Sequence, residues 1–211
     1  MTAATTAPVP TAPVPTAPVP ATPVPAASAD RRVAWLLTVC GALGLAASGV
    51  LTVDKLRLLQ DPAYVPSCNI NPVISCGSVM RTDQASAFGV PNSLFGLAAF
   101  AVVLATGAGL FAGATYRRWY WTGLQLGSLA GVGFVLWLAD QALYEIGALC
   151  PYCLVVWAVV APLAWYLSLH NSAWLRRVVG RYHWTVPLLW YTVLAMLVLE
   201  RFWSYWRTLL P

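Results

Sequence analysis

Five apolar segments, each close to the ~20 residues that a helix needs to cross the hydrocarbon of a bilayer, account for about half of this chain. We expect helices over residues 33–53, 92–114, 119–140, 150–169 and 184–203. Charged residues make up only 9% of the 211 residues, too few to cover the surface of a soluble protein of this length. A helix satisfies its own backbone hydrogen bonds in lipid, so the sequence predicts an all-α integral membrane protein.

The basic residues predict how the segments are oriented. One end receives Arg31, Arg32, Arg117, Arg118, Arg176, Arg177 and Arg181, all close to the segment ends. The opposite end receives Lys55, Arg57, Arg81, Arg201 and Arg207. Since cytoplasmic loops carry the excess of Lys and Arg, we expect a multi-pass protein of the cell membrane with a cytoplasmic N-terminus and an extracytoplasmic C-terminus. The net charge of +5 then reflects topology and contacts with anionic lipids, and requires no nucleic-acid partner.

Residues 1–30 differ in composition from the rest of the chain. They contain a near-pentapeptide repeat, APVP-TAPVP-TAPVP-ATPVP, which lacks aromatic and charged groups. Proline at this density favours an extended polyproline II backbone and cannot build a core. We expect a disordered, Pro-rich cytoplasmic tail over 1–30, followed by a five-helix transmembrane domain over 31–211.

Four of the five cysteines form two pairs that this topology places on the same, extracytoplasmic side. Cys68 and Cys76 lie in the long outer loop 54–91, and a connection of this length suggests a function. Cys150 and Cys153 form a C-x-x-C motif that opens the fourth apolar segment. A helix N-terminus stabilises thiolates, and the thiolate is the nucleophile in thiol–disulfide exchange. The pattern predicts dithiol chemistry at the outer membrane surface, where disulfides persist.

Other interpretations of the cysteines fit less well. A Cys₄ zinc site is disfavoured because the spacing Cys68-x₇-Cys76 is not that of a zinc knuckle, so we expect no metal. Two structural disulfides in a non-enzymatic membrane protein are one alternative. A transmembrane thiol electron conduit is another, but it needs cysteines reached from the cytoplasm, and only Cys40 lies away from the outer side. We expect Cys40 to pack as a small apolar residue.

Three segments together carry a family resemblance: the pair Cys68-x₇-Cys76, the run Asn92-Ser93-Leu94-Phe95-Gly96 that opens the second span, and the motif Cys150-x-x-Cys153. With them, the region 33–169 resembles the vitamin K epoxide reductase family, and in particular its bacterial disulfide-forming members. The resemblance implies a four-helix bundle around a quinone, with a fifth transmembrane helix added. An unrelated DsbB-like oxidase has its C-x-x-C motif in the earlier loop, so the order here argues against it.

The resemblance also implies roles for single residues. Cys68 exchanges with an external partner, Cys76 bridges to Cys150, and Cys153 faces the quinone. Asn92, followed by Ser93, matches the family asparagine that hydrogen-bonds a quinone carbonyl; a helix N-cap after Pro91 is the structural alternative. Trp157 stands where vertebrate members have an aromatic residue with a hydroxyl, so it would line the quinone site without that hydrogen bond.

These roles define an expected activity. We expect a quinone-dependent thiol:disulfide oxidoreductase that oxidises an extracytoplasmic thioredoxin-fold protein of the DsbA kind, with menaquinone as the native quinone. Many bacterial relatives carry a fused thioredoxin-like domain after the fifth helix, whereas this sequence stops at Pro211, so the partner is expected to be a separate protein. Asp140 and Glu145, near the outer end of the third span, are candidate proton donors, and helix-end solvation explains them nearly as well.

Overall fold

The computed structural model describes residues 28–207, and the proline-rich repeat lies outside the described residues. The predicted all-α membrane architecture is confirmed. Four helices are each long and apolar enough to cross a membrane, and a bent pair, 173–182 with 185–201, brings the number of candidate spans to five. The helices along the chain are α1 (Ser28–Gln60), α2 (Cys76–Met80), α3 (Asn92–Phe111), α4 (Arg118–Asp140), α5 (Pro151–Asn171), α6 (Ala173–Val179), α7 (Thr185–Arg201) and α8 (Trp203–Trp206).

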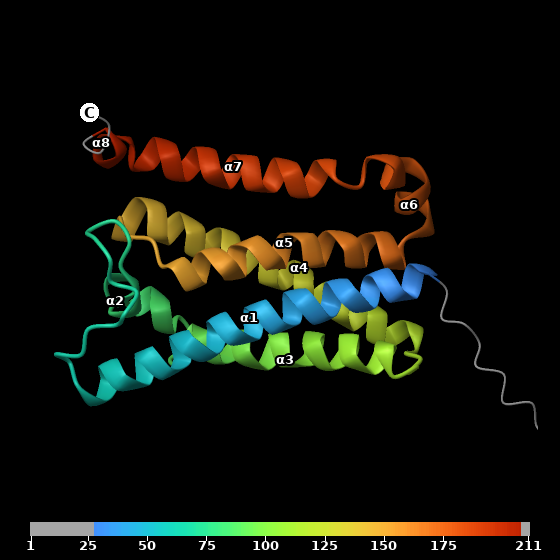
Figure 1. Ribbon diagram of the computed structural model, residues 1–211, viewed down its shortest axis with the longest axis horizontal. Helices are drawn as coiled ribbons and strands as arrows, with labels where there is room; N and C mark the ends of the chain where they lie inside the picture. The colour runs from blue at the N-terminus through green and yellow to red at the C-terminus, as the bar shows by residue number, and fades with distance from the viewer. Residues whose placement is uncertain (1–27, 208–211) are drawn as a thin grey trace, which may run out of the picture.

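The bundle is built from two helix pairs joined through α1 and α5 (Figure 1). Helix α1 packs on α3 and on α5, and α4 packs on α5. Glycines allow the closest of these approaches: a Cβ at Gly41 would lie 2.6 Å from the backbone nitrogen of Leu104, so α1 and α3 meet at backbone distance. By contrast, α3 and α4 make few contacts with each other within residues 28–207. The interior between these two helices is therefore not filled by helix packing.

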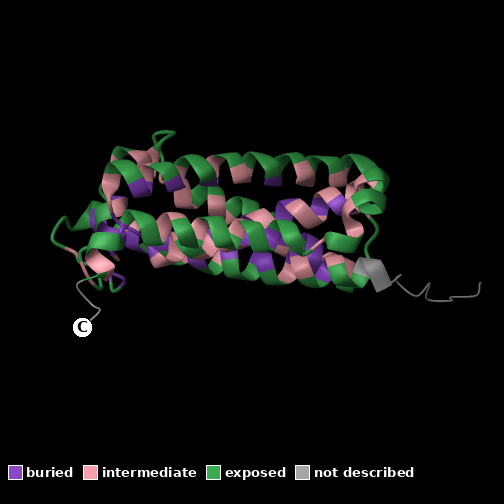
Figure 2. Cartoon of the chain, turned by 90° about the horizontal axis from the view of Figure 1, so that it is seen from above, coloured by how far each residue is buried: buried purple, intermediate pink, exposed green. Residues whose placement is uncertain are grey.

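The surface of the bundle suits a lipid surrounding. Large apolar side chains such as Leu126, Leu188 and Met196 are each more than 60% exposed. Figure 2 shows exposed residues along the outward faces of the helices. In a bilayer these faces contact acyl chains, so their exposure in the isolated chain is expected.

Helix α1 extends to Gln60, beyond the end predicted at residue 53, and the outer loop starts later than the predicted 54. Asp54 and Lys55 therefore lie on the helix. Both charged side chains have partners that permit this: Asp54 Oδ1 accepts a hydrogen bond from the Tyr64 hydroxyl at 2.9 Å, and Lys55 Nζ donates to the Met80 carbonyl at 2.5 Å. The predicted end of the helix was too early, because the apolar residues stop at Val53 whereas the helix continues through Asp54 and Lys55.

The connection between α4 and α5 is short, but it is not a simple loop. Residues Gln141–Ile146 continue α4 as a π-helix, which ends at Gly147 with φ of 67°. This left-handed conformation favours glycine, and it turns the chain back toward α5. Only Ala148 and Leu149 then separate the turn from Cys150.

Candidate dithiol site and the cavity beside it

Three of the four predicted redox cysteines meet at the end of the bundle that carries α2. Cys68 and Cys76 form a disulfide, with their Cα atoms 5.7 Å apart. Cys150 is a free thiol, and its Sγ lies 3.2 Å from Cys76 Sγ. Cys153 is also free and lies in the first turn of α5. The sulfurs thus form a continuous series from the outer loop to the interior of the bundle.

The loop that carries the first pair is shaped by short polar side chains. Asn71 Oδ1 accepts hydrogen bonds from the backbone N–H groups of Val73 and Ile74, which closes a turn. Asn69 Oδ1 accepts from the N–H of Gly77 at 2.8 Å. Ser75 caps α2 by accepting from the N–H of Ser78. These bonds fix Cys76 at the first position of a short helix.

A pair of backbone hydrogen bonds aligns the two cysteine segments. The N–H of Leu149 donates to the Val73 carbonyl at 2.7 Å, and the N–H of Ser75 donates to the Leu149 carbonyl at 2.9 Å. Together they form an isolated parallel β-bridge between Ile74 and Leu149. Cys150 follows Leu149 directly and Cys76 follows Ile74 by two residues, so the bridge explains the short distance between the two cysteines. Sequence analysis missed the bridge because two paired residues leave no periodic pattern.

The electrostatic surroundings of Cys150 favour its thiolate. Cys150 is the N-cap residue of α5, where backbone N–H groups lack helical acceptors. The hydrogen bond with the Cys153 thiol lowers the pKa of Cys150, and the N–H groups of Cys153 and Tyr152 add to this effect. Burial and the carboxylate of Asp54 act in the opposite direction without reversing it. Cys150 is therefore the better nucleophile and the better leaving group of its pair.

The disulfide is covered in this arrangement. Cys68 is 7% exposed, Cys76 is 0% exposed and Cys150 is 2% exposed, and they pack with Leu51 and Met80. A protein partner that reacts at Cys68 must therefore first move part of the loop 61–75. The loop lies at the surface and many of its residues are exposed, but both of its cysteines are buried.

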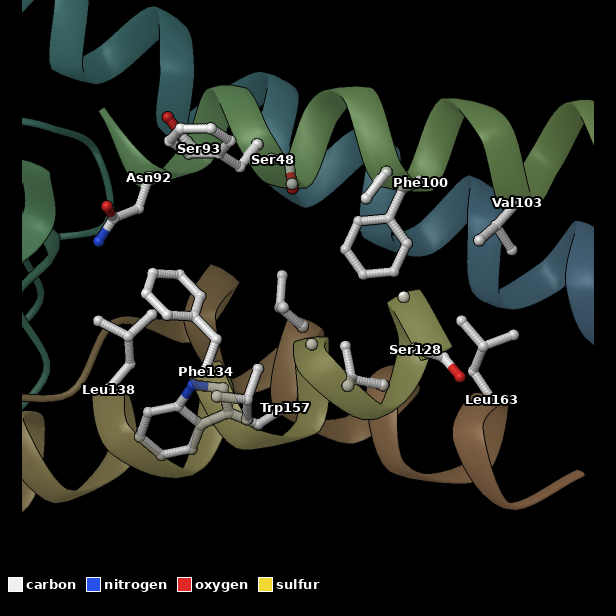
Figure 3. A pocket seen from close by; sticks show the side chains of 18 of the residues that line it. Ser48, Asn92, Ser93, Phe100, Val103, Ser128, Phe134, Leu138, Trp157 and Leu163 are labelled. Atoms are coloured by element: carbon white, nitrogen blue, oxygen red, sulfur yellow. The ribbon is translucent and has the colours of Figure 1, made fainter. Parts of the chain in front are cut away.

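A cavity of about 570 Å³ lies beside the cysteines, between the two helix pairs. Cys153, Asn92, Ser93 and Trp157 all line it, so the predicted quinone-site residues are brought together around one space. Figure 3 shows Phe100, Phe134 and Trp157 around its hollow. The rest of the wall is mainly apolar and comes from α1, α3, α4 and α5, including Leu51, Phe95, Val103, Leu124, Leu138, Val156, Val160 and Leu163.

Asn92 lines the cavity, but its amide is used by the outer loop. Its Nδ2 donates to the Gln84 carbonyl at 2.6 Å, and its Oδ1 accepts from the N–H of Ala87 at 3.1 Å. The alternative prediction of an N-cap is wrong, because α3 begins at Asn92 itself and Pro91 occupies the cap position. Asn92 instead ties the 3₁₀ turn Asp83–Ser86 over the outer end of the cavity.

Sequence analysis missed the contribution of α1 to the polar end of the cavity. Ser48 and Lys55 line it together with Ser93. Thr52 Oγ1 lies within hydrogen-bond distance of two oxygens, Ser93 Oγ at 2.9 Å and the Ser48 carbonyl at 2.8 Å. Polar residues at 48, 52 and 55 recur at helical spacing within the apolar segment, and this is the signal that could have found them.

The acidic residues suggested as proton donors lie elsewhere. Asp140 and Glu145 are exposed, and neither lines the cavity. Asp140 accepts a hydrogen bond from Gln141 at 3.2 Å. Within residues 28–207, no group of three or more His, Cys, Asp and Glu side chains is arranged to hold a metal ion.

Comparison with known proteins identifies the region that carries these features. The sequence model of the vitamin K epoxide reductase family matches residues 35–168, which include all four site cysteines and every cavity residue named above. No curated protein sequence matches the chain. Helix α7 lies beyond the matched region.

Proposed function

Because this chain belongs to the vitamin K epoxide reductase family, whose members are quinone-coupled membrane oxidoreductases, we propose that it generates disulfides in extracytoplasmic proteins. In this proposal, electrons pass from a partner dithiol through Cys68 and Cys76 to Cys150 and Cys153, and from there to a quinone. One observation carries the proposal. The Sγ of Cys150 lies 3.2 Å from the disulfide sulfur of Cys76, while Cys153 lines the large cavity.

The thiol steps balance as two exchanges. A quinone in the cavity supplies the oxidising power: it takes up two electrons and two protons as Cys150 and Cys153 become a disulfide. The Cys76 thiolate then attacks Cys150, so the 76–150 bond forms and Cys153 leaves as a thiolate. Next the Cys68 thiolate attacks Cys76, which forms the 68–76 disulfide and releases Cys150. The lowered pKa of Cys150 supports its role as the leaving group in this step.

The partner reaction closes the cycle. A thiolate of a reduced thioredoxin-fold protein, which we propose to be DsbA-like, attacks Cys68 and releases Cys76. The second thiol of the partner resolves the mixed disulfide, and the partner leaves oxidised. Because Cys68 is buried, the attack requires the loop to open first. We place both cysteine pairs outside the cell membrane and the N-terminus inside, from the distribution of arginines.

The cavity fits a quinone with a long apolar tail. Gly123 and Gly127 on α4 line it, and a Cβ built on either glycine meets no described atom within 4 Å. Glycines spaced by four residues usually mark tight helix packing in membranes, but here they widen a cavity. Cys153 lies near the polar outer end, and the apolar stretch continues inward to Tyr120. We propose menaquinone as the native quinone, with its ring near Cys153, Asn92, Ser93 and Trp157.

Counting free thiols tests the proposed function directly. Purified protein is reduced under anaerobic conditions, treated with excess menaquinone analogue, alkylated and weighed, with Cys153→Ala in parallel. We expect four thiols to disappear in the parent, with Cys40 unchanged, and none to disappear in the variant. Survival of the parent's thiols in excess quinone would contradict the oxidase function and favour static structural disulfides.

A further inference from the structure

Helix α5 carries a defect in its backbone hydrogen bonding beside the cavity. Pro162 lies inside the helix and has no N–H group, so the carbonyl of Ala158, four residues earlier, has no helical donor. An unpaired carbonyl is costly inside a bilayer, where water is not available as a donor. The same stretch of α5 forms the cavity wall, through Val156, Trp157 and Val160.

Helix α7 supplies the missing donor. The Tyr191 hydroxyl donates to the Ala158 carbonyl at 2.8 Å, in place of the absent N–H of Pro162. The indole Nε1 of the preceding residue, Trp190, donates to the Trp157 carbonyl at 3.0 Å. Both hydrogen bonds are made to the backbone of the part of α5 that lines the cavity, and they come from α7 on the other side of α5. Figure 1 shows α7 along the outer side of α5.

The other end of α7 makes the same kind of contact near the cysteines. Arg201 Nε donates to the Leu143 carbonyl at 2.6 Å. Leu143 lies in the last turn of the π-helix, where carbonyls run out of internal donors, and it is 1% exposed. The turn at Gly147 and the segment that leads to Cys150 follow directly. Arg201 therefore stabilises the start of the segment 143–149, which leads to Cys150 and places it beside Cys76.

We propose that α7 positions the reactive bundle by donating side-chain hydrogen bonds to backbone carbonyls that lack helical donors, with Tyr191 and Arg201 as the positioning residues. Neither residue touches the reacting sulfurs or lines the cavity. Tyr191 keeps the Trp157 wall in place for the quinone, and Arg201 keeps Cys150 in reach of Cys76. The expected effects on kinetics rest on the proposed function, whereas the role of α7 in pairing these carbonyls does not.

Kinetics separate the two positioning roles. Tyr191→Phe should raise the quinone KM about threefold to tenfold with little change in kcat, since a hydrogen bond between membrane helices that contributes about 0.6–1.4 kcal/mol corresponds to such factors. Arg201→Leu should lower kcat and leave the quinone KM unchanged. Thr192→Val and Arg207→Leu are matched controls, because Thr192 donates within α7 and Arg207 is an exposed arginine near the same end. A Tyr191→Phe variant with parental KM would overturn the role of Tyr191.

A double-mutant cycle tests the hydrogen-bond argument without any activity. Pro162→Ala restores an N–H for the Ala158 carbonyl and removes the need for the Tyr191 hydroxyl. Tyr191→Phe should therefore lower the thermal unfolding temperature in the parent and leave it nearly unchanged in the Pro162→Ala background. Equal losses in both backgrounds would overturn the inference. If the parent reduces no quinone while this cycle shows the expected coupling, the proposed function fails and the bracing by α7 stands.

Discussion

At the scale of single residues, the reactivity of the cysteine cluster depends on how Cys150 differs from its neighbours. Its position at the N-cap of α5 and its hydrogen bond with Cys153 lower its pKa, despite burial. The thiolate fraction of Cys150 is therefore larger at neutral pH than that of an ordinary thiol. It is lost only when the pH falls through the lowered pKa. Because the thiolate is both nucleophile and leaving group, this one residue favours exchange with Cys76 in either direction.

The pH dependence of Cys150 modification should report this effect. In a variant that lacks Cys40, Cys68 and Cys76, the rate of reaction with a small methylthiolating reagent is measured against pH. With Cys153 present, we expect the rate to rise at a lower pH than for an ordinary thiol. Cys153→Ala removes the largest cause of the shift, so the inflection should move to higher pH. Identical profiles with and without Cys153 would show that the hydrogen bond does not set the reactivity.

At the scale of elements, the β-bridge between Ile74 and Leu149 fixes the relative register of two loops. The cysteines that these loops carry, Cys76 and Cys150, are 74 residues apart along the chain. The register depends on the Leu149 N–H and on the Leu149 carbonyl, not on its side chain. A small displacement of either sulfur would strongly slow thiol–disulfide exchange between them.

Removing one donor of the bridge should therefore uncouple the cysteine pairs. In a Cys68→Ala, Cys153→Ala background, Cys76 and Cys150 are the only facing thiols, and mild oxidation should join them. Leu149→Pro deletes the donor to the Val73 carbonyl and should lower the cross-linked fraction about tenfold, as expected for a loss of about 1.4 kcal/mol. Leu149→Ala keeps the backbone donor and serves as the control. Efficient cross-linking in the proline variant would show that other contacts set the register.

The glycines of α4 lead to a second prediction at this scale. Gly127→Leu places a large side chain in the cavity, where the glycine faces open space. We expect kcat/KM to fall about tenfold or more for a quinone with a long isoprenoid tail, and much less for a tail-less quinone. Gly133→Leu is the control, since Gly133 is on the same helix, has open space and does not line the cavity. Equal losses for both quinones would place the tail elsewhere.

At the scale of the whole molecule, the sequence predicts the membrane spans better than the details of the cavity. Apolar length determines which helices cross the membrane, so α3, α4 and α5 were found close to their observed bounds. The end of α1 was missed because charged Asp54 and Lys55 find partners in the outer loop only after folding. The hydrogen bonds of Asn92 with Gln84 and Ala87 likewise depend on tertiary structure.

The clearest prediction for the whole molecule concerns its orientation in the membrane. Helix α2, which begins at Cys76, and helix α6, which carries Arg176 and Arg177, lie at opposite ends of the bundle (Figure 1). A single orientation therefore determines whether the cysteines face an oxidising compartment. In a cysteine-free background, Ile70→Cys and Arg177→Cys place one exposed thiol at each end. A membrane-impermeant maleimide added to intact cells should label Ile70→Cys and spare Arg177→Cys, and permeabilised cells should label both. The reverse pattern would place Cys68 in the cytoplasm, where thiols are kept reduced, and would contradict the proposed formation of disulfides in extracytoplasmic proteins.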